Sequence, residues 1–281
     1  MSTPAPAPAP AVLSAASTPP GPADPSDRPD HADLTAGGTG GRPRRVLISG
    51  GTSGIGYACA EYLVSRGEHV WVLGFSPGGV KAAREQIALA GASVCDVSVE
   101  DDVVNAVHAA REAMGGIDGV FVNAGIDGEG LPAAQLDASH FRRVMDVNVL
   151  GAFLVARTAL GAPEPPSSIV FNASVNALRP ELNFLEYNAS KAAVVSMAKS
   201  LALEVSGRGV AVTAVCPGYF PTRMTAPYLD DPGISQELRA RIPAGRFGDL
   251  AEIAALVDFL LSPRAAFMTG SVVSIDGGAS I

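Results

Sequence analysis

Short apolar runs rich in β-branched residues alternate along this chain with longer segments of helical periodicity. Several of these runs are apolar at nearly every position, as parallel strands buried on both faces require. The predicted strands are Arg45–Ser49, His69–Leu73, Ala92–Cys95, Gly119–Val122, Ser168–Ala173, Val210–Cys216 and Ser271–Ile275. The predicted helices lie near residues 55–66, 79–90, 101–114, 138–160, 186–206 and 249–261. Seven strands separated by six crossover helices predict a single α/β domain built on a doubly wound parallel sheet.

Two stretches depart from this alternation. Residues 1–43 are rich in Ala and Pro, which favour an extended chain and build no core, so we expect a disordered leader before a catalytic domain at 44–281. A wrongly assigned start codon is the alternative explanation. The leader lacks the charged start and apolar centre of a secretory signal. Residues 218–248 are rich in Pro, Gly and aromatic residues, and they predict an excursion that covers a site.

Composition and charge narrow the class of protein. The 281 residues are 47% hydrophobic and carry a formal net charge of −8, so the chain offers no basic stripe to nucleic acid. No apolar run approaches the ~20 residues of a membrane span, so we expect no membrane partner. The three cysteines of the chain are those expected of a cytoplasmic protein.

The cysteines and histidines indicate neither disulfides nor a metal site. Three cysteines fall in apolar segments without metal-ligand spacing, which predicts reduced core residues: Cys59, Cys95 and Cys216. The four histidines are scattered and none stands near a second ligand in the sequence: His31, His69, His108 and His140. We therefore expect no metal.

A glycine-rich loop follows the first predicted strand and opens the next helix. It reads SGGTSGIG, residues 49–56, where Gly50, Gly54 and Gly56 allow a tight turn and a close approach of backbone to ligand. The N-terminus of the following helix offers free N–H groups and a favourable dipole to an anion. This position between strand and helix predicts a site for the pyrophosphate of a dinucleotide.

A second set of polar residues lies in the other half of the chain. Tyr187 and Lys191 stand four apart at the head of a predicted helix, in YNASK, so their side chains share one face. Ser174 ends the preceding strand, where α/β sheets present ligands. A free tyrosine is a weak acid with a pKa near ~10, and a neighbouring ammonium brings it closer to exchanging a proton with a substrate oxygen.

The order of these motifs resembles the short-chain dehydrogenase/reductase family and its Rossmann-type fold. The Gly loop is similar to the family's TGxxxGIG motif, with Ser49 where Thr is commoner, and the similarity extends over residues 45–279. The resemblance implies a nicotinamide cofactor, NAD(P)(H), and a homo-oligomer, either dimer or tetramer. It also implies the catalytic set Asn148, Ser174, Tyr187 and Lys191.

The resemblance further implies a set of cofactor contacts spread over the strand ends. Asp96 would contact the adenine, and Thr222, in a P-G-x-x-x-T element, would contact the nicotinamide carboxamide. Asn123-Ala124-Gly125 matches the end of the family's N-N-A-G motif, with Val122 in place of the first Asn. The implied contacts are Gly50, Thr52, Ser53, Gly54, Ile55, Gly56, Gly74, Phe75, Ser76, Asp96, Val97, Asn123, Ala124, Gly125, Tyr187, Lys191, Pro217, Gly218 and Thr222.

The end of the second predicted strand bears on the choice of cofactor. NAD-preferring relatives carry an acidic residue at the Gly74 position, and no carboxylate stands here to repel a 2′-phosphate. Ser76 has a hydroxyl to donate, whereas no Arg stands at Phe75. Lys81 and Arg84 are either further phosphate ligands or solvated helix residues. We therefore favour NADP(H) over NAD(H).

The implied reaction is the interconversion of a small cyclic or aromatic alcohol and its ketone. Tyr187 would exchange the proton, Ser174 would polarise the substrate oxygen, Lys191 would bind the nicotinamide ribose and Asn148 would hold a water. Residues expected either to line the substrate pocket or to pack beneath the excursion are Asn176, Phe184, Tyr219, Phe220, Met224 and Tyr228. The alternatives are a non-redox enzyme of dehalogenase type and a cofactor-sensing binding protein, both on the same fold.

Overall fold

Seven parallel strands lie side by side in the order β3-β2-β1-β4-β5-β6-β7. The computed structural model describes residues 42–281, so the predicted leader falls almost wholly outside the described residues. The strands are β1 (Arg45–Ser49), β2 (His69–Gly74), β3 (Gly91–Val94), β4 (Gly119–Val122), β5 (Ser168–Asn172), β6 (Ala211–Pro217) and β7 (Val272–Ile275). The predicted doubly wound parallel sheet is confirmed, and each predicted strand end lies within one residue of the observed one.

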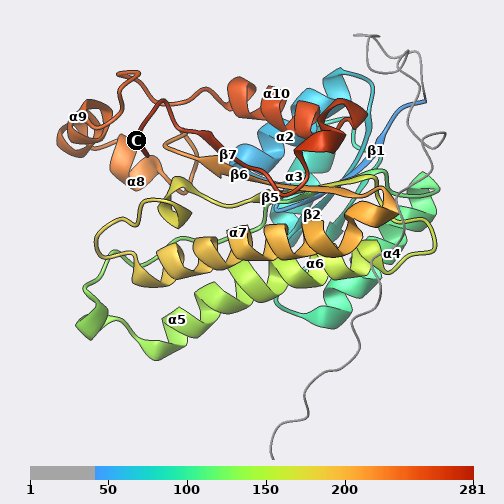
Figure 1. Cartoon of the computed structure of the whole chain (residues 1–281), viewed down its shortest axis with the longest axis horizontal. Helices are drawn as coiled ribbons and strands as arrows, with labels where there is room; N and C mark the ends of the chain where they lie inside the picture. The colour runs from blue at the N-terminus through green and yellow to red at the C-terminus, as the bar shows by residue number, and fades with distance from the viewer. Residues whose placement is uncertain (1–41) are drawn as a thin grey trace, which may run out of the picture.

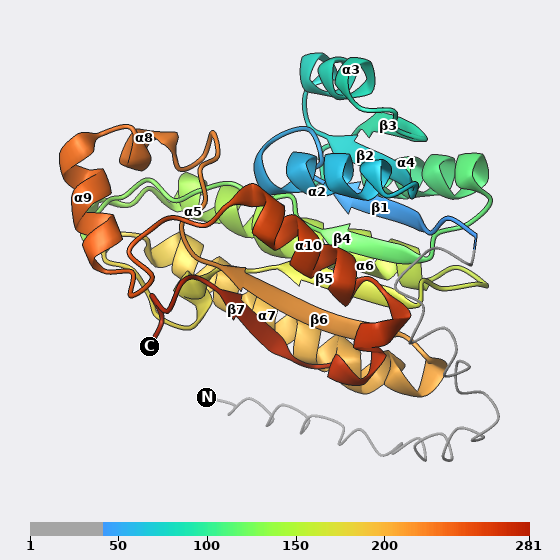
Figure 2. The ribbon, with the colours of Figure 1, turned by 90° about the horizontal axis from the view of Figure 1, so that it is seen from above.

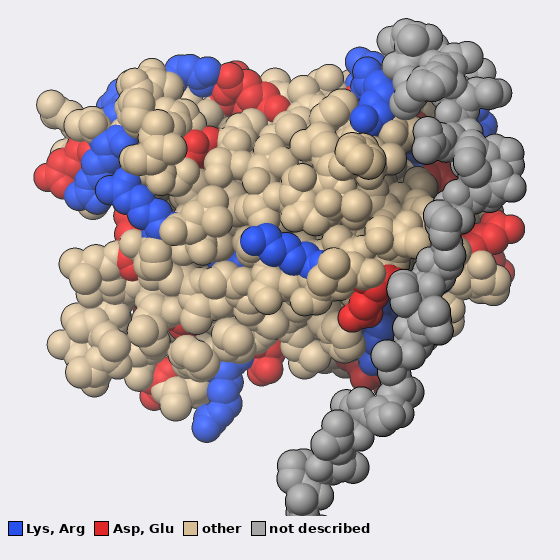
Figure 3. All heavy atoms as spheres, viewed as in Figure 1, with Lys and Arg blue, Asp and Glu red and all other residues tan. Residues whose placement is uncertain are grey.

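Helices cover both faces of the sheet. Figures 1 and 2 show α2 and α10 on one face, and α4, α6 and α7 on the other. The helices are α2 (Gly54–Ser65), α3 (Pro77–Gln86), α4 (Glu100–Met114), α5 (Ala138–Met145), α6 (Gly151–Leu160), α7 (Leu185–Val205), α8 (Ala226–Leu229), α9 (Pro232–Ala240) and α10 (Leu250–Leu260). Short 3-10 turns add η2 (Ala133–Gln135), η4 (Val175–Ala177), η5 (Ser206–Arg208) and η6 (Pro263–Met268). In the orientation of Figure 1, the surface shows broad uncharged areas with charged side chains mainly toward its edges (Figure 3).

The alternation of side chains along the strands supplies two apolar layers. In β1, Val46 and Ile48 belong to the layer that includes α2 and α10, whereas Leu47 belongs to the layer under α4, α6 and α7. All three side chains are fully buried. The apolar centre of β1, residues 46–48, is therefore explained by burial on both faces of the sheet, as its sequence predicts.

The predicted helix at 138–160 is wrong in one respect, because it is interrupted. A π-helical segment, η3 (Asp146–Leu150), separates α5 from α6. Asn148 lies in this segment, and its side-chain amide is bonded on both sides to the backbone of Ile126: Oδ1 accepts the N–H at 2.8 Å and Nδ2 donates to the C=O at 3.0 Å. Such π-bulges inside α-helices often occur at functional sites.

The segment 218–248 leaves the sheet after β6 and returns at α10. It contains α8 and α9, which Figure 2 shows beyond one end of the sheet, on the same side as the C-terminus. The preceding strand ends at Pro217, so the segment begins at the carboxyl edge of the sheet, where open α/β sheets bind ligands.

A cluster of ion pairs ties the start of β1 to elements distant in sequence. Arg44 donates to Glu68 Oε1 at 2.7 Å through Nη2, and the same nitrogen contacts Asp258 Oδ1 of α10. The two carboxylate side chains are only 7% and 9% exposed. Two buried carboxylates therefore share one guanidinium, which must offset the cost of removing both charges from water.

We expect Arg44→Ala to lower the free energy of unfolding by about 2–4 kcal/mol, because it leaves the buried Glu68 without a cation and leaves Asp258 with only the partly exposed Arg66, 3.4 Å away. Urea unfolding checks this. The matched control is Arg42→Ala, since Arg42 binds Asp118 through a side chain that is 62% exposed; it should cost less than about 1 kcal/mol. Equal effects of the two substitutions would contradict the argument.

Candidate active site

The glycine-rich loop between β1 and α2 needs glycine for two different physical reasons. Gly50 and Gly54 adopt positive φ angles of 66° and 55°, which side chains other than glycine rarely adopt. A Cβ atom on Gly56 would lie 2.4 Å from the carbonyl oxygen of Gly50, and one on Gly50 would lie 2.8 Å from Ala124 Cα. The loop is therefore closed against itself and against the end of β4.

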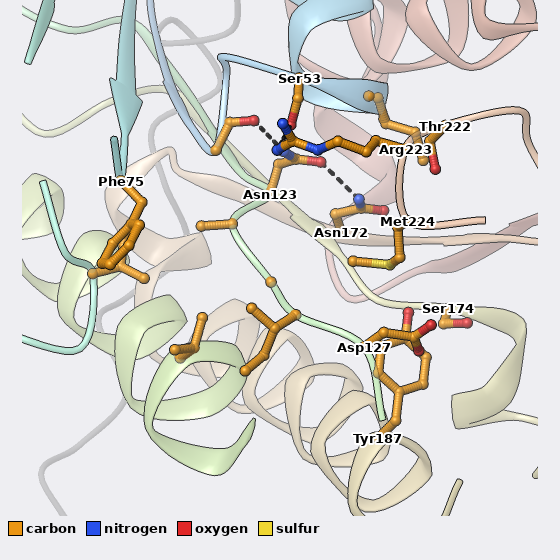
Figure 4. A pocket seen from close by; sticks show the side chains of 18 of the residues that line it. Ser53, Phe75, Asn123, Asp127, Asn172, Ser174, Tyr187, Thr222, Arg223 and Met224 are labelled. Atoms are coloured by element: carbon orange, nitrogen blue, oxygen red, sulfur yellow. Dashed lines mark hydrogen bonds between the residues drawn. The ribbon is translucent and has the colours of Figure 1, made fainter. Parts of the chain in front are cut away.

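Side-chain hydrogen bonds join the ends of β1, β4 and β5. Ser49 Oγ accepts the N–H groups of Asn123 and Ala124 at 2.9 and 3.1 Å. The Asn123 side chain donates back to the carbonyl oxygens of Ser49 and Gly50 at 3.1 Å each. Asn172 Nδ2 in turn donates to Asn123 Oδ1 at 2.8 Å, as a dashed line in Figure 4 marks. These bonds fix the loop relative to the strand ends.

The N-terminus of α2 offers donors that suit an anion. Its N-cap, Ser53, makes no side-chain capping bond, and the first turn carries no acidic residue. The first N–H groups of a helix lack partners within the helix, and an anion stabilises them. Arg223 of the segment 218–248 points Nη2 toward Ser53 Oγ at 3.5 Å (Figure 4). The donors present here therefore fit the pyrophosphate of a dinucleotide.

A cavity of about 1060 Å³ runs from this loop to Ser174, Tyr187 and Lys191. All of the expected cofactor contacts line its wall except Gly56 and Gly74, which lie behind it. A Cβ atom on Gly74 would lie 2.4 Å from Thr52 Cγ2, so the Thr52 side chain fills the space that an acidic residue would need.

Ser174, Tyr187 and Lys191 converge at one end of this cavity. Tyr187 lies in the first turn of α7, and Lys191, one turn later, places Nζ 5.5 Å from the centre of the tyrosine ring. Lys191 Nζ also donates to the backbone oxygen of Asn172 at 2.9 Å. Ser174 follows β5, and its Oγ accepts the N–H of Asn176 at 3.2 Å. Figure 4 shows Ser174 and Tyr187 side by side.

Asn148, the fourth residue of the expected catalytic set, lies behind the wall. It is 1% exposed, and beyond its two bonds to Ile126 its Nδ2 donates to Ser190 Oγ at 3.0 Å. A Cβ atom on Gly125 would lie 3.2 Å from Asn148 Oδ1 and 3.4 Å from Lys191 Nζ. The structure therefore places Asn148 next to the lysine.

Burial shifts the two titratable groups of the site in opposite directions. It raises the pKa of Tyr187, and the negative charge of Asp127 adds to this, while a hydrogen bond with Ser174 opposes it. Burial lowers the pKa of Lys191 to about 8. In both cases burial disfavours the charged form, because each charge would have to be held away from water.

A second cavity, of about 250 Å³, adjoins Ser174 and Tyr187 on the side of α8 and α9. Five of the expected substrate-pocket residues line it: Asn176, Phe184, Tyr219, Met224 and Tyr228. Phe184 and Tyr228 pack edge to face, with ring centres 6.2 Å apart. Phe220 is different, since it is 2% exposed and packs in the apolar layer of α2 and α10, touching only the larger cavity.

Several polar residues that line these cavities are not among the residues predicted for the site. Asp127 and Glu181 line the second cavity, and Arg223 lines the first. The histidines are scattered in the sequence, but the fold brings His140 to within 3.2 Å of Glu129 and 3.6 Å of the fully buried Glu186. His140, Glu129 and Glu186 come from three separate segments, so no spacing in the sequence could have shown that they lie together.

The cysteines of the described residues behave as expected. Cys59, Cys95 and Cys216 are buried and form no disulfide. Among residues 42–281, no set of three His, Cys, Asp or Glu side chains is arranged to hold a metal ion. Nor does that part of the chain contain a helix long and apolar enough to cross a bilayer.

The fold and the site define a class of dinucleotide-binding oxidoreductases, and comparison with known proteins agrees. The family model described as enoyl-(acyl carrier protein) reductase matches residues 50–280. The chain belongs to the short-chain dehydrogenase/reductase family and is a dehydrogenase/reductase that binds NAD(P)(H).

Two curated relatives are each 35% identical over 243 residues. One is 2-(S)-hydroxypropyl-CoM dehydrogenase 3 of Xanthobacter autotrophicus, with 83% of this chain and 95% of the relative covered. The other is 2,5-dichloro-2,5-cyclohexadiene-1,4-diol dehydrogenase of Sphingobium indicum, with 84% and 96% covered. Both relatives are alcohol dehydrogenases.

Two similar crystal structures contain different nicotinamide cofactors. The 3-ketoacyl-(acyl-carrier-protein) reductase of Brucella melitensis, in complex with NADH, is 32% identical with a TM-score of 0.76, and 85% of this chain and 98% of that chain are covered. A variant of actinorhodin polyketide ketoreductase, with NADPH, is 29% identical with a TM-score of 0.79, and the coverage is 85% and 97%.

We expect Lys191→Met to raise the free energy of unfolding at pH 7 by about 1–3 kcal/mol, because a buried ammonium costs more than its one bond to Asn172 returns. The folded-state pKa of about 8 is below the unfolded value of 10.5. The unfolded state therefore binds more protons between those values, and stability rises with pH there. The gain should be complete below pH 8 and should disappear above pH 10.5.

Urea unfolding of the cofactor-free protein at pH 7 and at pH 10.5 measures this difference. The matched control is Lys199→Met, on an exposed position of the same helix, which should leave stability unchanged. A Lys191→Met protein less stable than the wild type at pH 7 would show that the lysine is stabilising.

Proposed function

We propose that the enzyme interconverts a small cyclic secondary alcohol and its ketone, with Tyr187 as the acid and base. The observation that carries this proposal is the position of Ser174 and Tyr187, which line both cavities. The larger cavity has the glycine loop and helix N-terminus that suit a dinucleotide. The smaller one is then left for the substrate, directly beside the group that exchanges the proton.

The roles of the catalytic residues follow from their surroundings. When bound, the nicotinamide supplies or accepts a hydride at the substrate carbon. In reduction Tyr187 donates a proton to the carbonyl oxygen, and in oxidation it removes the proton from the hydroxyl group. Ser174 donates a hydrogen bond to the same oxygen. Lys191, next to the ring of Tyr187, favours the phenolate, and together with the positive charge of the oxidised cofactor it offsets the effect of burial on the pKa of Tyr187.

Asn148 acts by holding neighbouring groups in place and not by exchanging a proton. Its amide holds the backbone of Ile126 on both sides and is bonded to Ser190, one residue before Lys191. We propose that it holds a water in line with Lys191, as the family resemblance implies.

For the cofactor we favour NADP(H). Gly74 leaves no carboxylate at the end of β2, and the Thr52 side chain occupies the space where one would stand. Ser76 lines the cavity and caps α3 by accepting the N–H of Gly79 at 3.1 Å. Lys81 and Arg84 do not line the cavity, and Lys81 lies 3.8 Å from Glu85. The preference therefore rests on missing repulsion and not on an added cation.

A ring-shaped substrate suits the smaller cavity. Its volume of about 250 Å³ and its aromatic walls, Phe184, Tyr219 and Tyr228, match a small cyclic molecule better than a long acyl chain. One relative, the cyclohexadienediol dehydrogenase, acts on a ring, whereas the other, the hydroxypropyl-CoM dehydrogenase, does not.

We also propose a cytoplasmic homo-oligomer, dimer or tetramer. The buried, unpaired cysteines suit a reducing compartment. Large apolar side chains are exposed on the helical surface, including Leu203 at 86% and Phe153 at 39%. Such exposure is costly in a monomer, and subunit contact would remove it.

Fluorescence titration of the purified protein with NADPH and with NADH tests the cofactor assignment. We expect both to bind and NADPH to bind more tightly, because nothing at the end of β2 repels its 2′-phosphate. Tighter binding of NADH would overturn the preference. Binding of neither would contradict the assignment of the larger cavity.

Substitution of Tyr187 by Phe tests the mechanism. We expect turnover to fall by at least about 100-fold while cofactor affinity is retained, because only the proton-transferring hydroxyl is lost. The matched control is Tyr57→Phe, which removes a hydroxyl bonded to Gln86 at 3.1 Å away from both cavities. Undiminished turnover in the Tyr187→Phe protein would exclude Tyr187 as the acid and base.

A further inference from the structure

Two tyrosine–carboxylate pairs are built into the walls of the smaller cavity. The Tyr228 hydroxyl donates to Asp127 Oδ2 at 3.0 Å, and the Tyr219 hydroxyl donates to Glu181 Oε1 at 2.7 Å. In each pair the tyrosine belongs to the segment 218–248 and the carboxylate to another loop. The pairs therefore hold that segment against the rest of the domain where the substrate would lie.

Asp127 is the carboxylate closest to the chemistry. It lines both cavities, as Ser174 and Tyr187 do, and Figure 4 shows it between these two side chains in the view. After burial, its negative charge is the largest influence that raises the pKa of Tyr187. A group bound by Asp127 would therefore lie on the same molecule as the oxygen that reacts at Tyr187.

The Asp127 carboxylate has hydrogen-bonding capacity to spare. Oδ1 accepts the N–H of Gly128 at 2.9 Å and Oδ2 accepts the hydroxyl of Tyr228. An ionised carboxylate offers about four acceptor positions, so these two contacts leave room for others. Within residues 42–281 no Lys, Arg or His side chain forms an ion pair with it. Burial raises the pKa of Asp127, while the hydrogen bonds from Gly128 and Tyr228 and the charge of Lys191 oppose this. A hydrogen-bond donor on the substrate would fill the acceptor positions of Asp127 that the protein leaves free.

We propose that Asp127 binds a second hydroxyl group of the substrate, so that the enzyme prefers cyclic diols and hydroxyketones to simple alcohols and ketones. This rests on the proposed function. In oxidation, one hydroxyl-bearing carbon loses a hydride to the oxidised cofactor, its oxygen loses a proton to Tyr187, and a C=O bond forms. The second hydroxyl does not react and donates to Asp127.

The charges around the cavity favour a neutral hydroxyl group over an anionic or a cationic group on the substrate. Three acids line this cavity, Asp127, Glu181 and the exposed Glu237, against one cation, the exposed Arg241, so a substrate carboxylate or phosphate would meet net repulsion. A substrate ammonium would meet Lys191 and the positive charge of the oxidised nicotinamide. A neutral hydroxyl avoids both forms of repulsion.

The test compares kcat/KM for cyclohexanol, the 1,2-, 1,3- and 1,4-cyclohexanediols, 2-aminocyclohexanol and 3-hydroxycyclohexanecarboxylate, with the oxidised cofactor in excess. We expect at least one diol to exceed cyclohexanol by about tenfold, and the amine and the acid to fall below it. Asp127→Ala should reduce the diol-to-cyclohexanol ratio to about one. Glu237→Gln, an exposed acid at the mouth of the same cavity, should leave the ratio unchanged.

A pH profile of oxidation provides a second readout, and it uses Asp127→Asn in case the alanine variant fails to fold. The other groups that influence Tyr187 (Ser174, Glu181, Tyr228 and Lys191) are all retained in this variant. Removing the charge of Asp127 should lower the pKa of Tyr187, so oxidation should reach half its maximal rate at a lower pH. An unmoved profile would overturn the proposed position of Asp127 at the reacting group.

The outcomes separate this proposal from the function on which it rests. Oxidation of cyclohexanol as efficient as that of every diol, or a diol preference that survives Asp127→Ala, would overturn the role of Asp127 and leave the oxidoreductase intact. The same holds if the cofactor binds and simple alcohols react while no diol does. A protein that binds neither NADPH nor NADH would instead contradict the proposed function.

Discussion

A continuous line of hydrogen bonds crosses the carboxyl ends of β1, β4 and β5, and both halves of the site depend on it. It begins at Ser49, passes through the side chains of Asn123 and Asn172, and ends where Lys191 donates to the backbone oxygen of Asn172. The side chain of Asn123 also closes the glycine loop, because it donates to the carbonyl oxygen of Gly50. The cofactor end and the catalytic end are therefore parts of one hydrogen-bonded edge of the sheet.

At this edge of the sheet, the buried side chains of Lys191 and Tyr187 lower the stability of the ligand-free protein. Lys191 is 4% exposed and has no carboxylate partner among the described residues, and Tyr187 stands beside a negative charge. Each is costly without a ligand. In the proposed mechanism, the positive charge of an oxidised nicotinamide would change that balance, because it would favour the phenolate of Tyr187 when a proton is to be removed. Stability is thus reduced where the chemistry needs a poised acid and base.

The parts of the structure that the sequence predicts are those that arise from local patterns. Apolar runs identify the strands, because burial on both faces of the sheet makes most positions of the central strands apolar. The glycine loop is predictable because strand, glycines and helix are contiguous. The π-helical break at Asn148 is not, since the contacts made there are a pair of bonds to Ile126, 22 residues away, which no local pattern shows. The hydrogen bond between Tyr228 and Asp127 joins residues 101 positions apart, and the hydrophobic pattern of the sequence does not predict such a contact.

The segment 218–248 links the two cavities, which explains why it leaves the sheet for so long. Thr222 packs over Gly54, and Arg223 reaches Ser53 at the start of α2. A few residues further on, Tyr228 is bonded to Asp127 in the substrate cavity. One short piece of chain thus contacts the anion-binding helix end and the substrate wall. The segment is a wall common to both cavities, because Gly218, Met224 and Thr225 line each of them.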